Sequence, residues 1–256
     1  MTQDERLDIL VEGFKADSVE YRDIPTPESA DEKRRLLRSL MNIRMPRPLP
    51  EDLKLVQDEY LRARAEEKGI VTLDDIPTLG SARPFADRLS LWQGDITRLQ
   101  VDAIVNAANS AMLGCFQPCH NCIDNCIHTY AGVELRAECA RQMEALRRRY
   151  GRHYEQPTAV PMLTDGCSLP AKKIVHIVGP IVILRSRQSM NDGLPPATAI
   201  RSICVRKTHS GAWPSAASPP VYSVSRRSGQ QKLRCRRSQT GWVSTRIKWS
   251  ASSSRF

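Results

Sequence analysis

Apolar residues recur at helical spacing through the first third of the chain. Two such sets each follow a proline: Leu36, Leu37, Leu40 and Met41 after Pro27, and Leu53, Val56, Tyr60 and Leu61 after Pro50. The segment MPRPLP between them breaks any helix, because proline lacks a backbone N–H. Farther on, Thr72 and Asp75 have the spacing of a helical capping box. We therefore expect residues 1–86 to form a helical extension that packs on a neighbouring domain.

Strand-like and helix-like patterns alternate from residue 87 to residue 182. The expected strands are LSLWQG, VDAIVNAAN and IVHIVGPIV, at residues 89–94, 101–109 and 174–182. Residues 133–151 have the pattern of an amphipathic helix ended by Gly151. The third strand is continuously apolar, which is typical of strands buried on both faces of an α/β sheet. This alternation predicts a layered α/β domain.

Residues 183–256 lose this pattern. They show no sustained period, about a fifth of them are serine, and arginine is scattered throughout, which is a composition typical of disorder. The whole chain has a net charge of +10, from 38 basic and 28 acidic residues. Residues 183–256 contribute fourteen of the basic residues and one acid, Asp192, which leaves 24 basic and 27 acidic residues in 1–182. A nucleic-acid-binding role, with its steep salt dependence, would rest on this tail alone, and we expect no specific nucleic-acid partner.

The sequence gives no sign of a membrane or a secretory segment. No run of about 18 apolar residues occurs, so we expect no transmembrane helix. The first residues, MTQDERLDIL, are polar and acidic rather than positively charged and then apolar. We therefore expect a soluble, cytoplasmic protein.

Cysteines cluster in the middle of the chain. Six of the eight lie between residues 115 and 167, and Cys115, Cys119, Cys122 and Cys126 fall within twelve residues, with His120 among them. Thiolate sulfur and imidazole nitrogen are the ligands that zinc prefers. A loop with three of them would leave a fourth coordination position open, as in catalytic zinc sites. A small structural zinc clip is the alternative interpretation.

Two polar motifs follow the first two expected strands. Asn106 to Ser110, NAANS, come where α/β sheets bind ligands, and asparagine can bond sugar hydroxyls, although it is also common in turns. In the motif GDIT, Asp95 could accept a hydrogen bond from an amino group such as that of adenine. The alternative for Asp95 is a helix N-cap.

The motifs GDIT, DAIVNAANS, IH…AG…LR and LP…IVHIVGP, in this order, resemble the macrodomain family. The string MLGCFQPCHNCIDNCIHTYAG is similar to the zinc-containing subclass of that family, and the resemblance runs from about Glu32 to Val182. It implies a three-layer α/β/α fold at residues 87–182, the first half of a macrodomain, behind the helical extension 1–86. It also implies a zinc-dependent hydrolase that removes ADP-ribose from modified proteins. The alternative is a non-catalytic ADP-ribose-binding module with structural zinc.

The resemblance assigns roles to single residues. It implies that Asp95 and Ile96 bind adenine, that Asn109 faces the distal ribose, and that the zinc ligands are Cys115, His120 and Cys122. The implied catalytic residues are Asn109, Asp124 and Asn125, with the latter two orienting water or ribose beside the metal. Zinc would polarise a ribose hydroxyl or a water that attacks the anomeric carbon. Cys119 is an alternative fourth ligand or a free thiol, and Cys126 is not an expected ligand.

Two positions depart from the family pattern. Ala159 stands after Thr158 where we expect glycine, and Pro161 is a poor residue for a central strand. Both departures fall just before the third expected strand, so they put the local strand pairing in question.

The tail lacks the second half of a macrodomain, including its phosphate-binding loop of the STG-x-F/Y type. Residues 195–242, back-translated with degenerate codons and read two bases later, permit a sequence that contains STGVFGFP. We therefore predict a net frame change between about Gly179 and Pro195, which makes residues 183–256 an out-of-frame tail. We expect this C-terminal part to be disordered or misfolded, and the chain as written to have little activity.

Overall fold

The structure, a computed structural model, describes residues 1–82 and 85–179 with their side chains, together with the backbone of three later strands. Residues 1–179 lie in one compact unit, and the three later strands lie in a second. Within the described residues, none of the helices is both long enough and apolar enough to cross a membrane.

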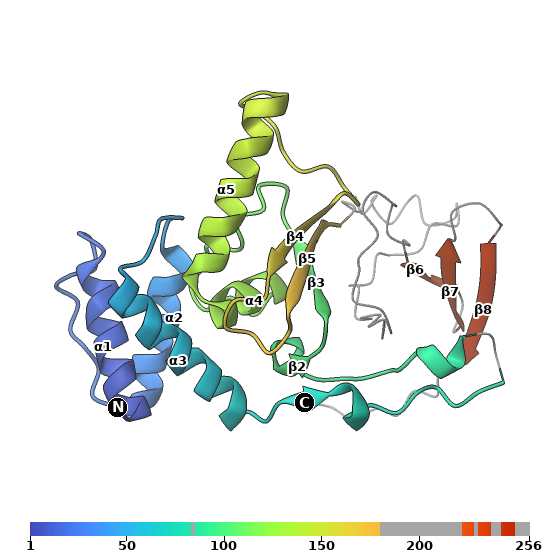
Figure 1. Cartoon of the computed structure of the whole chain (residues 1–256), viewed down its shortest axis with the longest axis horizontal. Coiled ribbons are helices and arrows are strands. Elements are labelled where there is room, and N and C mark those ends of the chain that lie inside the picture. Colours follow the sequence, from blue (N-terminus) through green and yellow to red (C-terminus); the bar gives the residue numbers. More distant parts are fainter. Residues whose placement is uncertain (83–84, 180–221, 228–229, 237–241, 249–256) are drawn as a thin grey trace, which may run out of the picture. The chain divides into compact units, whose positions relative to one another are not determined.

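Three helices form the predicted extension: α1 (Gln3–Ala16), α2 (Ala30–Ile43) and α3 (Glu51–Glu67) (Figure 1). Helix α2 begins after the N-cap Ser29, whose side chain accepts a hydrogen bond from the Glu32 N–H, and α3 begins after Pro50. The helices share a core to which each contributes apolar side chains: Leu7, Leu10, Val11, Phe14, Leu37, Leu40, Met41, Tyr60 and Leu61. The helical periodicity is thus confirmed.

A short connection joins this extension to the next layer of structure. The predicted capping box is present, because Thr72 and Asp75 bond each other reciprocally at the start of the 3-10 helix Leu73–Asp75. Strand β1 (Val71–Thr72) then pairs in parallel with β2 (Leu99–Gln100). The extension is therefore tied to the chain that follows by main-chain hydrogen bonds as well as by side chains.

The central sheet contains β3 (Ala103–Ala108), β5 (Lys173–Val178) and β4 (Pro161–Asp165), in the order β3-β5-β4. Strands β3 and β5 are parallel, and β4 runs antiparallel to β5. Pro161 is the first residue of β4, which lies at an edge of this sheet. That position accommodates a residue without an N–H, so Pro161 does not disrupt the pairing.

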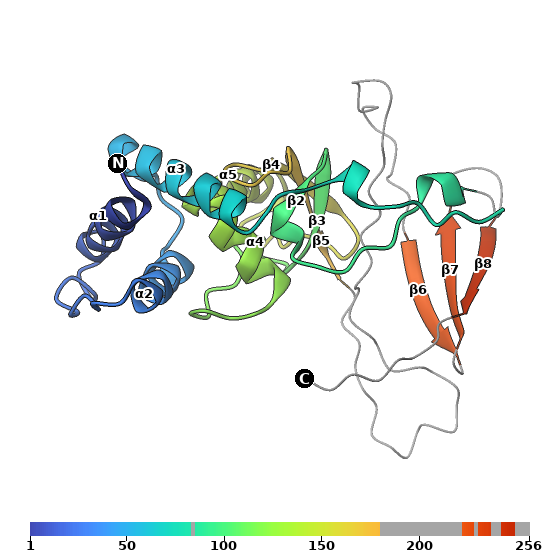
Figure 2. The same cartoon turned by 90° about the horizontal axis from the view of Figure 1, so that it is seen from below.

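Helices α4 (Ile123–Ala131) and α5 (Val133–Tyr150) pack on β3 and β4 and cover one face of the sheet (Figures 1 and 2). Alternate side chains of the strands point into this face, whereas Val105 is 39% exposed and Leu163 is 43% exposed on the other. Strand β5 alternates in the same way, so the expected burial on both faces is not found within the described residues. The described residues supply one of the two expected helical layers, and residues 180–182 lie outside them.

One predicted strand is absent from the part of the chain that the structure describes. Residues 89–94 form no strand; Ser90 makes an isolated antiparallel bridge with Thr78, and Leu91 is 50% exposed. The prediction rested on alternation alone, but a strand also needs a hydrogen-bonding neighbour along its length. Among the described residues, that pairing is limited to the bridge and a hydrogen bond from the Leu79 N–H to the Leu89 carbonyl (2.8 Å).

The second unit contains an antiparallel sheet of β6 (Tyr222–Arg227), β7 (Gln230–Arg236) and β8 (Trp242–Lys248), in that order. These strands fall within the segment 183–256 that we predict to be out of frame. The rest of residues 183–256 lies outside the described residues. So does the interval of the predicted frame change, residues 179–195, apart from Gly179 itself.

Candidate functional site

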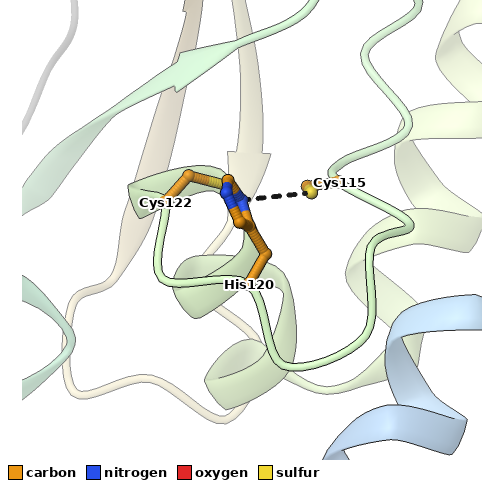
Figure 3. Close-up of side chains that lie close together, drawn as sticks. All are labelled: Cys115, His120 and Cys122. Carbon is orange, nitrogen blue, oxygen red and sulfur yellow. Dashed lines mark hydrogen bonds between the residues drawn. The ribbon is translucent and has the colours of Figure 1, made fainter.

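Cys115, His120 and Cys122 converge at the loop before α4 (Figure 3). Their candidate ligand atoms all lie within 4.8 Å of one another, and Cys115 Sγ is 3.7 Å from His120 Nδ1. A tetrahedral zinc site has Zn–S near ~2.3 Å and Zn–N near ~2.0 Å, which places its donor atoms roughly 3.5 to 3.8 Å apart. The three predicted ligands therefore fit a zinc ion with small adjustments, and the exposed His120 leaves one side of the site open.

Cys122 also begins the helix behind the site. Its Sγ accepts a hydrogen bond from the Asn125 N–H (3.3 Å), which makes it the N-cap of α4. Burial raises the pKa of the Cys122 thiol, the Asn125 N–H lowers it, and the neighbouring Cys115 raises it again, so that the pKa lies above its usual value. Bound zinc would reverse this direction, because a coordinating thiol loses its proton.

The other two cysteines of the cluster face the extension instead. Cys119 Sγ lies 3.2 Å from Ser39 Oγ and 3.5 Å from the Arg35 carbonyl, both on α2. Cys126 Sγ lies 3.6 Å from Arg38 Nη2. The structure thus places Cys119, the alternative fourth ligand, outside the group of three converging ligands.

Asp124 lies behind the metal loop, in the core. It is 6% exposed, and its Oδ1 accepts a hydrogen bond from Asn106 Nδ2 (2.7 Å). Burial raises the Asp124 pKa, although the Asn106 hydrogen bond and the charge of Arg136 oppose this effect. Asn106 also lies 3.0 Å from Nδ1 of the buried His176. These contacts direct the carboxylate inward, whereas we predicted that it orients water or ribose.

Asn125 is fully buried and bonds the metal loop itself. Its Nδ2 donates to the carbonyl of Gln117 (2.9 Å) and, at 3.4 Å, to that of Cys115, while its Oδ1 accepts from Arg38 (3.0 Å). The side chain therefore holds the loop that carries the ligands. Any contact with ribose or water would have to compete with these three bonds.

Asn109 is exposed at the end of β3 and bonds the metal loop. Its Nδ2 donates to the carbonyl of Gly114 (3.0 Å). Gly114 has a φ of 77°, and a Cβ there would come within 2.7 Å of the His128 ring. Glycine is thus required both by the backbone conformation and by the close approach of the ring.

Asp95 is the N-cap of the 3-10 helix Ile96–Arg98. Its Oδ1 accepts from the N–H (3.0 Å) and hydroxyl (2.7 Å) of Thr97, and its Oδ2 lies 3.4 Å from Lys68 Nζ on the extension. Burial raises the Asp95 pKa, but the Thr97 bonds and the Lys68 charge outweigh it, and the pKa falls below its usual value. The structure thus supports the N-cap interpretation, and adenine binding by Asp95 stays a prediction. Ile96 is buried in the core.

Ala159 has a φ of 64°, in the left-handed region that favours glycine. The position is paired to β5 through the hydrogen bond from its N–H to the Val178 carbonyl (3.0 Å). This backbone conformation is the physical reason for a glycine after Thr158 in the family pattern. Pairing persists despite the alanine.

Three residues that the sequence analysis missed shape this site: Arg38, Asn42 and Arg136. Each is a polar residue on a helix, and Asn42 and Arg136 occupy buried positions, at 1% and 4% exposed. Arg136 falls at helical spacing with the buried Cys139 and Met143, and Asn42 follows Met41. A polar side chain at a core position of a helical pattern is the signal that could have found the last two.

Comparisons with known proteins identify sequence relatives of this chain. A family model described as "Macro domain" matches residues 105–203. A protein named protein-ADP-ribose hydrolase from Treponema medium is 44% identical over 182 residues, covering 71% of this chain and 67% of the relative. One of the same name from Staphylococcus aureus (strain MSSA476) is 36% identical over 189 residues, or 74% of this chain and 66% of the relative. The chain thus spans about two thirds of the length of these relatives.

Solved structures show a partial likeness as well. A Trypanosoma brucei macrodomain in complex with ADP-ribose is 25% identical, with a TM-score of 0.37, and the match covers 60% of this chain and 61% of that one. The family of the chain is decided by its sequence relatives. The Treponema medium protein is 44% identical to it, over 67% of that protein's length. By that likeness, and by the matched family model, this chain belongs to the macro domain family.

Proposed function

We propose that this chain carries the metal-binding half of a zinc-dependent hydrolase that removes ADP-ribose from modified proteins. The observation that carries the proposal is the convergence of Cys115, His120 and Cys122 on one point beside α4. The relatives named protein-ADP-ribose hydrolase support the hydrolase activity. A cluster of free cysteines suits a reducing compartment, where thiols stay available to bind metal, so we propose a cytoplasmic location.

The residues around the loop have different proposed roles, in ligand binding and in positioning. Asn109, exposed and bonded to Gly114, would meet the distal ribose, and Asp95 would receive the adenine amino group at Oδ2 in competition with Lys68. When bound, zinc would supply Lewis-acid polarisation of a ribose hydroxyl or a water. For Asp124 and Asn125 we propose positioning roles, since their polar atoms are already bonded to Asn106 and to the loop.

Replacement of one ligand tests the metal role. Since we expect little activity from the chain as written, the test uses the chain with its frame restored. There we expect Cys122→Ala to abolish release of ADP-ribose from a modified protein while leaving part of the nucleotide binding, because binding groups such as Asn109 remain. Turnover is measured with a labelled ADP-ribosylated protein, and nucleotide binding by calorimetry. Cys167→Ala is the matched control, since this exposed cysteine lies outside the converging group. Undiminished turnover in Cys122→Ala would contradict the proposal.

Removal of the metal from the chain with its frame restored distinguishes a hydrolase from a binding module. If zinc takes part in the reaction, a chelator should stop turnover and leave ADP-ribose binding measurable. If the protein is a binding module with structural zinc, it should show no turnover before chelation, and chelation should lower its melting temperature.

We also propose that residues after about 180 are read out of frame in this chain. The charge distribution supports this, since the excess of basic residues is confined to 183–256. Sequencing the coding DNA of independent isolates across codons 175–200 is the direct test. Reads with one or two bases that restore STGVFGFP would bear the proposal out, and reads that confirm the printed frame would refute it.

A further inference from the structure

Helix α2 of the extension holds the metal loop through side chains. Arg38 Nη2 donates to the carbonyl of His120 (2.7 Å) and to Oδ1 of Asn125 (3.0 Å). Asn125 in turn donates to the carbonyl of Gln117 on the other limb of the loop (2.9 Å). One guanidinium therefore fixes the backbone of a candidate ligand directly and the opposite limb through one intermediary.

Asn42 makes a second connection from the same helix. This side chain is 1% exposed; its Oδ1 accepts from the Cys119 N–H (2.9 Å), and its Nδ2 donates to Thr129 Oγ1 on α4 (2.8 Å). Cys119 has a φ of 53°, a conformation that costs about 1 kcal/mol or more for a residue other than glycine. The Asn42 bond thus helps to hold a strained turn between two ligands.

The guanidinium of Arg38 forms hydrogen bonds to the metal loop and α4 but no ion pair within the described residues. Among the ion pairs of the described residues none involves Arg38, and its acceptors on the loop are neutral. A carbonyl that has lost its partner would turn toward water and take the adjoining ligand with it. Metal affinity depends on such supporting bonds, which typically change it by about 10- to 100-fold.

We propose that α2 is part of the metal site, and that Arg38 and Asn42 are positioning residues that hold the loop 115–122 in a ligand-competent shape before the ion arrives. The inference rests on the zinc site of the proposed function, not on hydrolysis. It makes the extension a determinant of metal affinity although it provides none of the three converging ligands.

Zinc affinity of the full chain tests this directly. Arg38→Ala is expected to weaken zinc binding about tenfold or more, measured by competition with a chromophoric chelator, and Arg38→Lys to recover part of the loss. Arg35→Ala is the matched control: its exposed side chain lies one turn earlier on α2, and the Arg35 carbonyl near Cys119 Sγ (3.5 Å) is backbone that the substitution keeps. Asn42→Ala should weaken binding in the same direction, because the Cys119 turn loses its partner.

A spectroscopic readout separates positioning from general stability. Cobalt(II) bound through Cys115 and Cys122 should give a thiolate charge-transfer band, which Arg38→Ala should shift or weaken and Arg35→Ala should leave unchanged. Wild-type zinc affinity and an unaltered band in Arg38→Ala would overturn the inference. Failure of the wild-type chain to bind zinc would overturn the proposed function as well, so the two failures are distinguishable.

Discussion

At residue scale, Ala159 carries a conformational cost that the sequence reveals. Glycine reaches a φ of 64° without the steric penalty that the alanine Cβ carries. Glycine also loses more conformational entropy on folding, which offsets part of this gain. We therefore expect Ala159→Gly to stabilise the protein by about 1 kcal/mol. Ala145→Gly, at an exposed position within α5, should instead destabilise by about 1 kcal/mol. Urea denaturation measures both, and a destabilised Ala159→Gly would contradict the strain argument.

His176 makes the core sensitive to acid. Burial lowers its pKa to about 4, below the value of about 6.5 in an unfolded chain. The ring bonds Asn106 and Thr164, and faces Cys139 and His128, whose own pKa is lowered by burial. Since the unfolded state takes up the proton first, stability is intact above pH 6.5 and falls as the pH drops toward 4.

The acid effect of His176 is of the order of 3 kcal/mol over that range. We expect His176→Gln to have a shallower dependence of unfolding free energy on pH between 4 and 6.5, whatever its stability at neutral pH. His153→Gln, at an exposed histidine, should keep the wild-type slope. Equal slopes in all three proteins would show that His176 is not responsible.

At the scale of elements, α5 fastens the extension to the metal loop through Arg136. Its guanidinium donates to the carbonyls of Met41, Asn42 and Arg44 at the end of α2 (3.2, 2.8 and 2.6 Å). It also donates to Leu113 (2.8 Å) at the start of the loop. The last carbonyls of a helix need such partners, so one side chain caps α2 and positions the loop together.

Loss of Arg136 should therefore be costly. Burial lowers its pKa to about 10, which still leaves the group charged at neutral pH. We expect Arg136→Leu to destabilise by about 3 kcal/mol or more, because several buried carbonyls lose their donor at once. Arg148→Leu, at an exposed position of α5, should change stability by less than about 1 kcal/mol. Comparable effects of the two substitutions on a denaturation curve would refute this role.

The periodicity of apolar residues predicted the helices, which bury one face. It failed for a strand, because a strand forms only where a neighbouring strand pairs with it. Leu37, Leu40 and Met41 gave the correct face of α2, and Gly151 the correct end of α5. Residues 89–94 have the alternation of a strand, but among the described residues only their first two positions pair with a neighbour. The spacing of the cysteines and His120 predicted a metal loop, but only the resemblance to zinc-containing macrodomains implied which three side chains meet. The contacts of Arg38 depend on how helices pack, which no local pattern records.

At the scale of the whole molecule, the described helices cover one face of the sheet. Val105 and Leu163 point away from α4 and α5 and are about two fifths exposed. If the tail is out of frame, we expect the chain as written to bind a hydrophobic dye and self-associate, since such apolar surface is unfavourable in water. A chain with the frame restored should be less associated by light scattering and should melt cooperatively. Monomeric behaviour and tight ADP-ribose binding of the chain as written would contradict this.

The bonds from α2 to the cysteine loop also bear on how such a site could be inherited. A loop whose shape depends on Arg38 and Asn42 does not contain all the residues that its metal site requires. Transplanting residues 114–123 into a macrodomain that lacks the extension would transfer the thiols and the imidazole but not their geometry. Gain or loss of the metal within this lineage should therefore go together with gain or loss of the N-terminal helices.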